Sequence, residues 1–114
     1  MWRTSSRVGN LVFVIGMIGR TDEGEIVDGV VPQTRLALSR IENVLAEHGI
    51  DRNAIVRLRA FVVDIREWPQ AREVIREFFA GDAPPATAMS VTGLVEPAVR
   101  VEIEVDAAVA EESQ

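Results

Sequence analysis

The stretch 53–79, NAIVRLRAFVVDIREWPQAREVIREFF, contains both periodicities on which the fold class depends. Between Asn53 and Asp64 the side chains alternate, which predicts a strand. One face of that strand would carry Val56, Leu58, Ala60 and Val62, and the other Arg57, Arg59, Phe61 and Val63. From Trp68 to Phe79 the apolar residues recur at helical spacing, and Gly81 follows as a stop signal. This passage from strand to helix predicts a chain that mixes both elements.

The segments before this stretch predict a hairpin and a helix. Leu11–Ile15 follows the turn signal Gly9-Asn10 as a continuous apolar run, which is typical of a strand covered on both faces. We expect Glu25–Val27 to return beside it as a short second strand. Residues 32–48 have apolar side chains at helical spacing, and Gly49 is suited to the position just beyond the helix end.

Two further strands are predicted after the stretch. Ala86–Thr92 is the first, and Val99–Val105, which alternates strictly between apolar and polar residues, is the second. The resulting order, β-β-α-β-α-β-β, predicts an α+β fold in which two helices pack on one face of a mixed sheet. Because neither a repeat nor a linker interrupts the pattern, we expect residues 1–114 to form a single domain.

Composition restricts the classes of function. The chain has 114 residues and a net charge of −6, from 12 Lys+Arg and 18 Asp+Glu, with no run of basic residues, which disfavours nucleic acid as a partner. The apolar run Leu11–Ile18 is too short to span a bilayer, so no membrane association is expected. The absence of cysteine excludes disulfides, thiolate metal sites and a cysteine nucleophile, and suits a reducing cytoplasm. A domain of this size leaves much surface exposed, so self-association would help it bury more.

Few residues offer metal, cofactor or triad chemistry. The single histidine, His48, falls in the last turn of a predicted helix, where the helix dipole favours a cation, and this structural interpretation is preferred to a catalytic one. Neither an acidic metal-binding loop nor a phosphate-binding glycine motif is present. We therefore expect neither a metal nor an organic cofactor.

Two charged positions allow both a structural and a functional interpretation. Glu102 lies on the polar face of the last predicted strand, where it is either simply solvated or a carboxylate at a cleft that orients or deprotonates water. Arg72 lies on the second predicted helix, where it either supports a solvated face or reaches into a cleft to bind a carboxylate at two points. Spacing alone favours the structural interpretation of both.

Several short segments match one protein family in order and spacing, over nearly the whole chain. They are Gly9–Val14 with Gly16, Gly24–Val27, Gln33–Arg35, Phe61–Asp64, Phe78–Phe79, Pro85–Ala86 and Val101–Glu104. Together they resemble the Rid family of reactive-intermediate deaminases, also called the YjgF type. The resemblance implies a chorismate-mutase-like fold and a homotrimer with its sites in clefts between subunits. It also implies hydrolysis of 2-imino acids or related enamines to 2-keto acids and ammonia, without a metal or organic cofactor.

The resemblance assigns roles to individual residues of this sequence. Glu102 matches the glutamate that helps to activate water, and Gly16 matches the glycine that contacts the substrate through its backbone. Thr87 stands where the family has the arginine that binds the substrate carboxylate. The other positions that the resemblance places at the cleft are Trp2, in place of a tyrosine, Arg72, in place of an asparagine, and Ile15 and Met17.

Two hypotheses address the missing arginine. Arg72 could approach the cleft from its helix and bind the carboxylate instead. Alternatively, the ligand is more apolar, and the pocket is lined by Ile15, Met17, Thr87 and Met89.

At the level of function, the first hypothesis is a Rid-like homotrimer that binds a small organic acid or imine and acts as a deaminase-type hydrolase with altered specificity. The alternative is a catalytically silent trimer that binds or senses a small molecule. The third and least favoured is an endoribonuclease, which the acidic composition disfavours.

Overall fold

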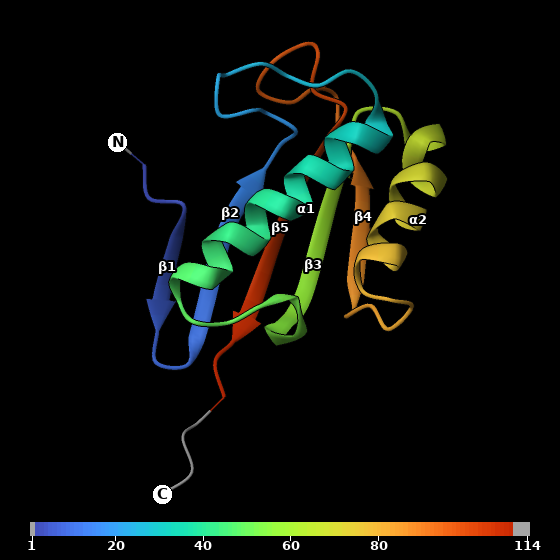
Figure 1. Cartoon of the computed structure of the whole chain (residues 1–114). Helices are drawn as coiled ribbons and strands as arrows, with labels where there is room; N and C mark the ends of the chain where they lie inside the picture. The colour runs from blue at the N-terminus through green and yellow to red at the C-terminus, as the bar shows by residue number, and fades with distance from the viewer. Residues whose placement is uncertain (1, 111–114) are drawn as a thin grey trace, which may run out of the picture.

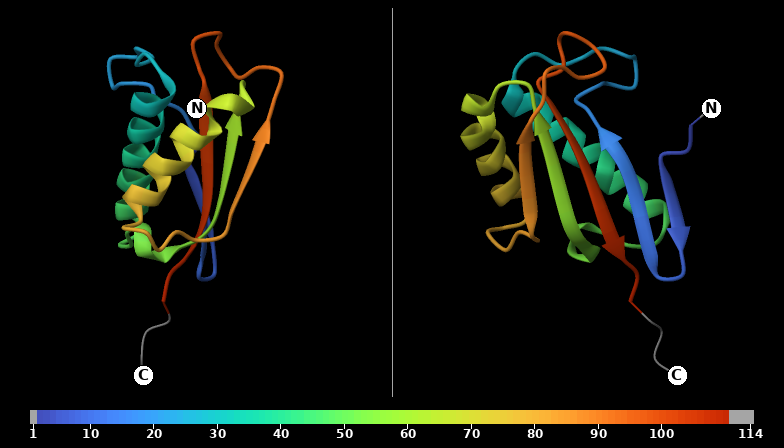
Figure 2. Two further views of the ribbon diagram at one scale, coloured as in Figure 1. Left: turned by 90° about the vertical axis from the view of Figure 1, so that its right-hand side faces the viewer. Right: turned by 180° about the vertical axis from the view of Figure 1, so that it is seen from behind.

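The computed structural model describes residues 2–110, which form one twisted sheet covered on one side by two helices (Figures 1 and 2). Five strands make the sheet in the order β1-β2-β5-β3-β4, in which only β3 and β4 are parallel. Their bounds are Ser5–Val8 for β1, Leu11–Met17 for β2, Ile55–Val62 for β3, Ala86–Ser90 for β4 and Val101–Ala108 for β5. The helices are α1, Val30–Glu47, and α2, Trp68–Phe78. The predicted α+β class and one-sided helical layer are confirmed. The order of elements also agrees, although its first two strands are not the two predicted segments.

Local sequence signals explain where both helices begin and end. Helix α1 starts directly after Gly29, whose carbonyl accepts from the Gln33 amide, and ends before Gly49, which adopts a left-handed φ of 73°. Helix α2 has a proline within its first two positions, where the missing N–H costs no hydrogen bond. The two helices therefore match the predicted segments to within two residues at each end.

The core lies between the sheet and the helices. Its largest fully buried apolar side chains are Leu38, Ile41 and Leu45 of α1, Leu58 of β3, and Ile103 of β5. Each such side chain contributes about 1.5–3 kcal/mol of transfer free energy. His48, at the end of α1, bonds through Nε2 to the hydroxyl of Ser5 at 2.8 Å and so ties the helix to the edge strand β1.

The opening hairpin differs from the prediction. Strand β2 pairs with β1, through the two-residue turn Gly9-Asn10, whereas Glu25–Val27 contributes only an isolated bridge between Ile26 and Arg20. The physical reason is the turn itself: Gly9 has φ 59°, and a two-residue turn of this kind reverses a strand immediately. Gly9-Asn10 is therefore the centre of a hairpin as well as the signal that precedes a strand.

Strand β2 is also not covered on both faces, contrary to its uninterrupted apolar sequence. Val12 and Val14 are buried under the helices, whereas Leu11, Phe13 and Ile15 are 41–46% exposed on the opposite face. The helices cover only one side of the sheet, so a strand of one chain cannot be buried on both.

Val56 is a third correction. It was expected beside Leu58 and Ala60, but it is exposed, because the pairing of β3 with β5 shifts register between Ile55 and Arg57. At such a bulge one residue, here Val56, has no partner on the neighbouring strand, and its side chain no longer follows the inward and outward alternation of the strand.

Candidate functional site on the open face of the sheet

The face of the sheet opposite the helices, here called the open face, carries three carboxylates on one strand. In β5 the residues Val101, Ile103 and Val105 are fully buried beneath the helices, and Glu102, Glu104 and Asp106 alternate with them on the open face. Their partners on β3 are Phe61, Arg59 and Arg57, respectively. The strict alternation that predicted this strand therefore places Glu102 where it was expected.

Gly16 and Glu102 lie in direct contact. Val14 pairs with Val105 and Met17 with Ile103, so two residues, Ile15 and Gly16, oppose a single residue of β5. A Cβ at Gly16 would lie 2.6 Å from both Cδ and Oε2 of Glu102. Only a glycine lets the backbone of β2 approach this carboxylate so closely. The structure thus brings together the two residues with the clearest match to the family pattern.

Glu102 differs from its neighbours because none of the residues that the structure describes is a partner of its carboxylate. Among the described residues no hydrogen bond or ion pair involves it, whereas Arg59 bonds to both Glu104 and Asp106 at 3.2 Å. Burial raises the pKa of Glu102 above its usual value, and the negative charge of Glu104 adds to the effect. A carboxyl whose pKa is raised in this way is able to take up and release a proton nearer to neutral pH.

Strand β4 supplies two further predicted residues to the open face. In the parallel ladder Thr87 lies beside Arg59, and Met89 beside Phe61. Met89, Phe61 and Glu102 therefore follow one another across three neighbouring strands. The carboxylate of Glu102 is consequently flanked by an aromatic ring on one side and by the backbone of β2 on the other.

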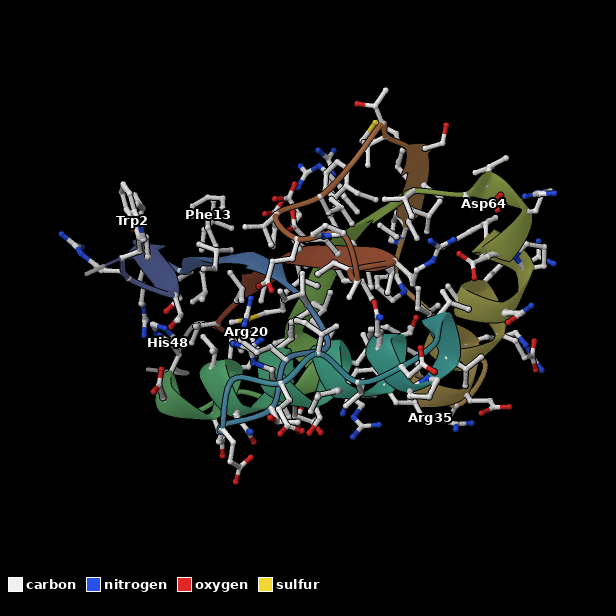
Figure 3. The ribbon with its side chains drawn as sticks, turned by 90° about the horizontal axis from the view of Figure 1, so that it is seen from above. Trp2, Phe13, Arg20, Arg35, His48 and Asp64 are labelled. Carbon is white, nitrogen blue, oxygen red and sulfur yellow. The ribbon has the colours of Figure 1, made fainter. Side chains whose placement is uncertain are left out.

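Ile15 and Phe13 border a hollow on the same face. It has a volume of about 490 Å³, and Glu104 and Asp106 contribute to its lining together with Arg3, Ser5 and Ser6 of the edge strand region. Figure 3 shows Phe13 projecting from β2 away from α1, on the same side as Trp2. Trp2 is almost fully exposed, and within one chain it covers nothing.

Met17 is not part of this surface, which corrects its predicted role in the pocket. It is only 3% exposed and belongs to the core beneath the helices. The physical reason is the bulge of β2: since Ile15 and Gly16 together occupy one position, the next residue points to the opposite face.

Arg72 lies exposed on α2, which covers the face opposite Glu102. The hypothesis that it replaces the missing arginine therefore cannot be satisfied within one chain and would require a second copy. On β3 the open face carries two arginines, Arg57 and Arg59, which the sequence analysis does not include among the site residues. The signal was available, because β3 was predicted to place both with Phe61 on one face, but no pairing of that strand with β5 could be read from the sequence.

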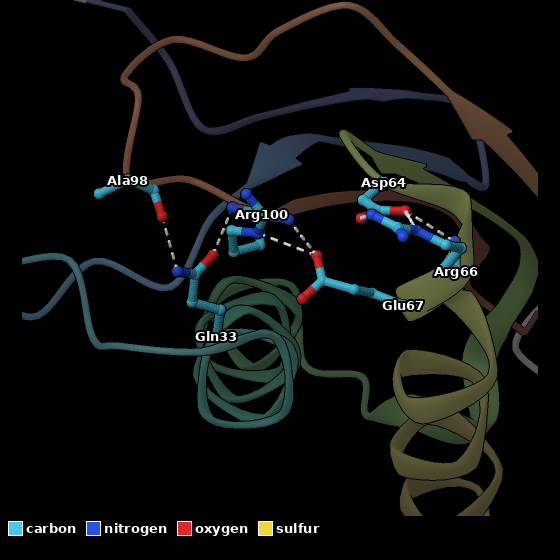
Figure 4. Close-up of polar contacts among 6 residues, drawn as sticks. All are labelled: Gln33, Asp64, Arg66, Glu67, Ala98 and Arg100. Atoms are coloured by element: carbon cyan, nitrogen blue, oxygen red, sulfur yellow. Dashed lines mark hydrogen bonds and ion pairs between the residues drawn. The ribbon is translucent and has the colours of Figure 1, made fainter.

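A buried glutamine fixes the start of β5, and with it Glu102 (Figure 4). Gln33 is 1% exposed; its amide donates to the carbonyls of Val27 and Ala98, and its oxygen accepts from the Arg100 amide at 2.7 Å. The Arg100 guanidinium in turn donates from Nε to Glu67 at 2.9 Å. These bonds connect α1, the loop after β2, and the residue that precedes β5.

Beside this network Arg66 donates to Asp64 from its backbone amide and its guanidinium (Figure 4). These bonds, chiefly those of the side chain, lower the pKa of Asp64 to about 2. Its role is to cap the short 3-10 helix Ile65–Glu67.

Within residues 2–110 no three His, Cys, Asp or Glu side chains are arranged to hold a metal ion, and neither described helix is long and apolar enough to cross a membrane.

The family model described as Endoribonuclease L-PSP matches residues 2–109, almost the entire chain. The chain belongs to this family. A RutC family protein of Pyrococcus abyssi is 33% identical to this chain over 90 residues, which cover 77% of this chain and 71% of the relative. A mouse protein named 2-iminobutanoate/2-iminopropanoate deaminase is 28% identical over 100 residues, or 86% of this chain and 73% of its own length.

Solved structures of L-PSP relatives agree with the fold. The crystal structure of a Mycobacterium tuberculosis member of the YjgF/YER057c/UK114 family superposes with a TM-score of 0.85 at 37% identity and covers 95% of this chain and 86% of its own. Escherichia coli TdcF with bound serine superposes with a TM-score of 0.89 at 25% identity, covering 96% of this chain and 89% of its own. The Rid resemblance of the sequence is thereby confirmed at the level of family and fold.

Proposed function

We propose that the protein is a Rid-like hydrolase that converts an imine or enamine to a carbonyl compound and ammonia, with Glu102 as its acid-base group. The observation that carries this proposal is the unpaired, half-buried Glu102 carboxylate held against Gly16 on the open face. Its raised pKa suits a group that must first accept and then donate a proton. Relatives named as imine deaminases give independent support.

The reaction can be written with one group from this chain. The Glu102 carboxylate takes a proton from water as the water oxygen bonds to the carbon of the protonated imine, and the C=N electron pair moves onto nitrogen. The protonated Glu102 then donates that proton to the nitrogen of the carbinolamine. As the C–N bond breaks, the hydroxyl oxygen forms the carbonyl, and its proton leaves with ammonia as ammonium. Glu102 is again a carboxylate, so the cycle closes.

We also propose that the chain assembles as a homotrimer with the open face at its subunit interfaces, so that a cleft there encloses Glu102. The exposed apolar side chains of that face support this assembly: Leu11, Phe13, Ile15 and Met89 are each at least 41% exposed in one chain. A mass of three chains in light scattering at micromolar concentration is expected, and a monomer would contradict the assembly. The absence of cysteine supports a cytoplasmic setting.

Thr87 favours a second candidate, a trimer that binds a small molecule without turnover. If the ligand is a carboxylate, a threonine offers no charge-assisted hydrogen bond to position it, and positioning provides much of the rate in such a site. The family description also names endoribonucleases. The net charge of −6 opposes binding of a phosphate backbone, so we do not propose this activity.

The deciding experiment follows the loss of freshly generated imines. Semicarbazide is added to react with the imine that has not been hydrolysed, so that the remaining amount can be measured. Glu102→Gln is expected to lower turnover by about 10²–10⁴-fold, the usual contribution of a positioned acid-base group. Glu104→Gln is the matched control, because it changes the same residue type on the same face and should retain turnover above pH 7. Equal activity in wild type and Glu102→Gln would remove the proposed role, and no wild-type activity would favour the silent binder.

A further inference from the structure

We propose that the site around Glu102 takes an imine or enamine that has an apolar body and no carboxylate group. This inference rests on the proposed function and specifies the substrate class for it. It follows from the charges that the open face presents within reach of Glu102.

The first step concerns the cations of this face. Along β3 and β5 the open face carries three carboxylates, Glu102, Glu104 and Asp106, and only two arginines, Arg57 and Arg59. Both terminal nitrogens of Arg59 are already bonded, one to Glu104 and one to Asp106. Arg57 pairs with Asp106, four residues along β5 from Glu102, or about 13 Å at the usual rise of a strand. Arg59 is therefore already neutralised by two carboxylates, and Arg57 lies too far along the strand to bind a ligand carboxylate next to Glu102. The further cation of this face, Arg3, lines the hollow with Glu104 and Asp106 and not with Glu102.

The second step concerns the neighbours of Glu102 itself. Thr87 is the residue of β4 beside Arg59, and it adds no charge. Phe61 is the direct partner of Glu102, Met89 lies beyond Phe61, and Ile15 precedes the glycine that contacts the carboxylate. These side chains offer apolar surface to the body of a ligand and no donor for an anion.

The third step is electrostatic. An anionic ligand bound at Glu102 would place a second negative charge beside a carboxylate that is already partly desolvated and close to Glu104. A protonated imine without a carboxylate brings a positive charge to the same place and becomes the missing partner of Glu102. The same carboxylate therefore both selects the cationic ligand and activates the water that attacks it.

The test uses two imines with the same isobutyl body. Leucine imine, made by an amino-acid oxidase, has a carboxylate on the imine carbon, and the imine that an amine oxidase makes from isoamylamine has hydrogen there. With catalase present and the spontaneous rate subtracted, kcat/KM for the carboxylate-free imine is expected to exceed that for leucine imine by about ten-fold or more. Equal or faster hydrolysis of leucine imine overturns the inference. If the Arg72→Ala variant then lost the hydrolysis of leucine imine, Arg72 of a second copy would be identified as the cation that binds the substrate carboxylate.

A pair of variants at one position sharpens the test. Thr87→Arg adds a guanidinium on β4 and is expected to raise kcat/KM for leucine imine by about ten- to a hundred-fold, while the other imine changes less than about three-fold. Thr87→Gln is the control for side-chain length without charge and should leave the ratio of the two substrates unchanged. A similar gain in Thr87→Gln would contradict the electrostatic argument.

Failure of the proposed function can be distinguished from failure of this inference. If neither imine is hydrolysed, the hydrolase proposal falls, and the ligand class is decided by binding of isobutyl methyl ketone against 2-ketoisocaproate, measured by NMR line shifts. Tighter binding of the ketone supports the inference. Tighter binding of the keto acid, or binding of neither, overturns it.

Discussion

The two faces of the sheet carry residues of opposite kinds, although they belong to the same strands. In β5 the side chains that face the helices, Val101, Ile103 and Val105, are fully buried, and those between them are acidic. In β2 the helix-facing residues Val12, Val14 and Met17 are buried, whereas Ile15 on the other face is 46% exposed. The helix-covered face accounts for the stability of one chain, and the open face retains groups that contribute little to it.

The faces differ equally in how their polar groups are satisfied. Under the helices Gln33 and Thr34 are buried, and each uses its side chain in hydrogen bonds. On the open face Glu102 is half-buried, and no described residue bonds to its carboxylate. An unpaired charged group that is partly removed from water costs free energy. The comparison therefore identifies Glu102 as the residue whose presence is better explained by function than by folding.

The largest expected effect tests the division of stability between the faces. Leu58→Ala removes a fully buried side chain from the covered face and should lower the free energy of unfolding by about 2–5 kcal/mol. Ile15→Ala on the open face should cost less than about 1 kcal/mol in an isolated chain, where that face is in water, and more in the proposed homotrimer, which covers it. Urea unfolding of both variants measures the difference. A comparable loss in Ile15→Ala would show that another subunit covers the open face in solution.

The next effect separates two glycines that are three residues apart. A Cβ at Gly19 would lie 2.5 Å from the backbone Cα of Gln33, so Gly19→Ala should lower stability by about 1–3 kcal/mol. The three atoms nearest to a Cβ at Gly16 all belong to the flexible side chain of Glu102, which can swing away. Gly16→Ala should therefore cost less than about 1 kcal/mol of stability and reduce turnover by about ten- to a hundred-fold, since the acid-base group is displaced.

Gly93→Ala is the control for both glycine variants, because a Cβ there meets nothing within 4 Å. It should leave stability and turnover close to those of the wild type. If Gly16→Ala were fully active, contact with Glu102 would not be needed for the reaction, and the site would have to be placed elsewhere on the open face.

Most of the covered face could be predicted from the sequence, because periodicity reports directly which side chains turn toward a core. The helices, β3, and the alternation of β5 all followed from spacing and from signals such as Gly49. The errors arose where one residue changed the alternation: Val56 and Met17 each lie next to a bulge, and a bulge depends on the partner strand. The apolar run of β2 was misleading for a related reason, because it does not reveal how many faces of the sheet are covered.

The site could be predicted only in part, because it depends on pairings between distant strands. Glu102 and Gly16 were found through the family resemblance, and the structure adds their contact. Arg59 was overlooked as a site residue, since its relation to Thr87 and Glu104 exists only once β3 lies between β4 and β5. The role of Arg72 stays a prediction that only a second copy could satisfy, because spacing along a helix does not show which side of the sheet that helix covers.

The smallest effect concerns the protonation of Glu102 and tests whether its carboxylate is a burden to the fold. Because its pKa is raised in the folded protein, the charged form is less favourable there than in the unfolded chain. Below the ordinary glutamate pKa of about 4.3 both states are protonated and no penalty exists. As pH rises through the folded-state pKa the penalty appears, so the wild type loses stability relative to Glu102→Gln.

We therefore expect Glu102→Gln to match the wild type near pH 3.5 and to exceed it at pH 7 by less than about 1 kcal/mol, since the side chain keeps part of its hydration. Urea unfolding of both proteins from pH 3.5 to 7 measures this difference. The other titratable groups are present in both proteins, so their effects on stability cancel when the two are compared. The pKa of Glu102 should also set the pH below which turnover falls. Glu104→Gln removes a neighbouring negative charge and should therefore move this fall in turnover to lower pH. If Glu104→Gln did not shift the pH at which turnover falls, a group other than Glu102 would carry the proton in the reaction. This would hold even if the expected difference in stability were found.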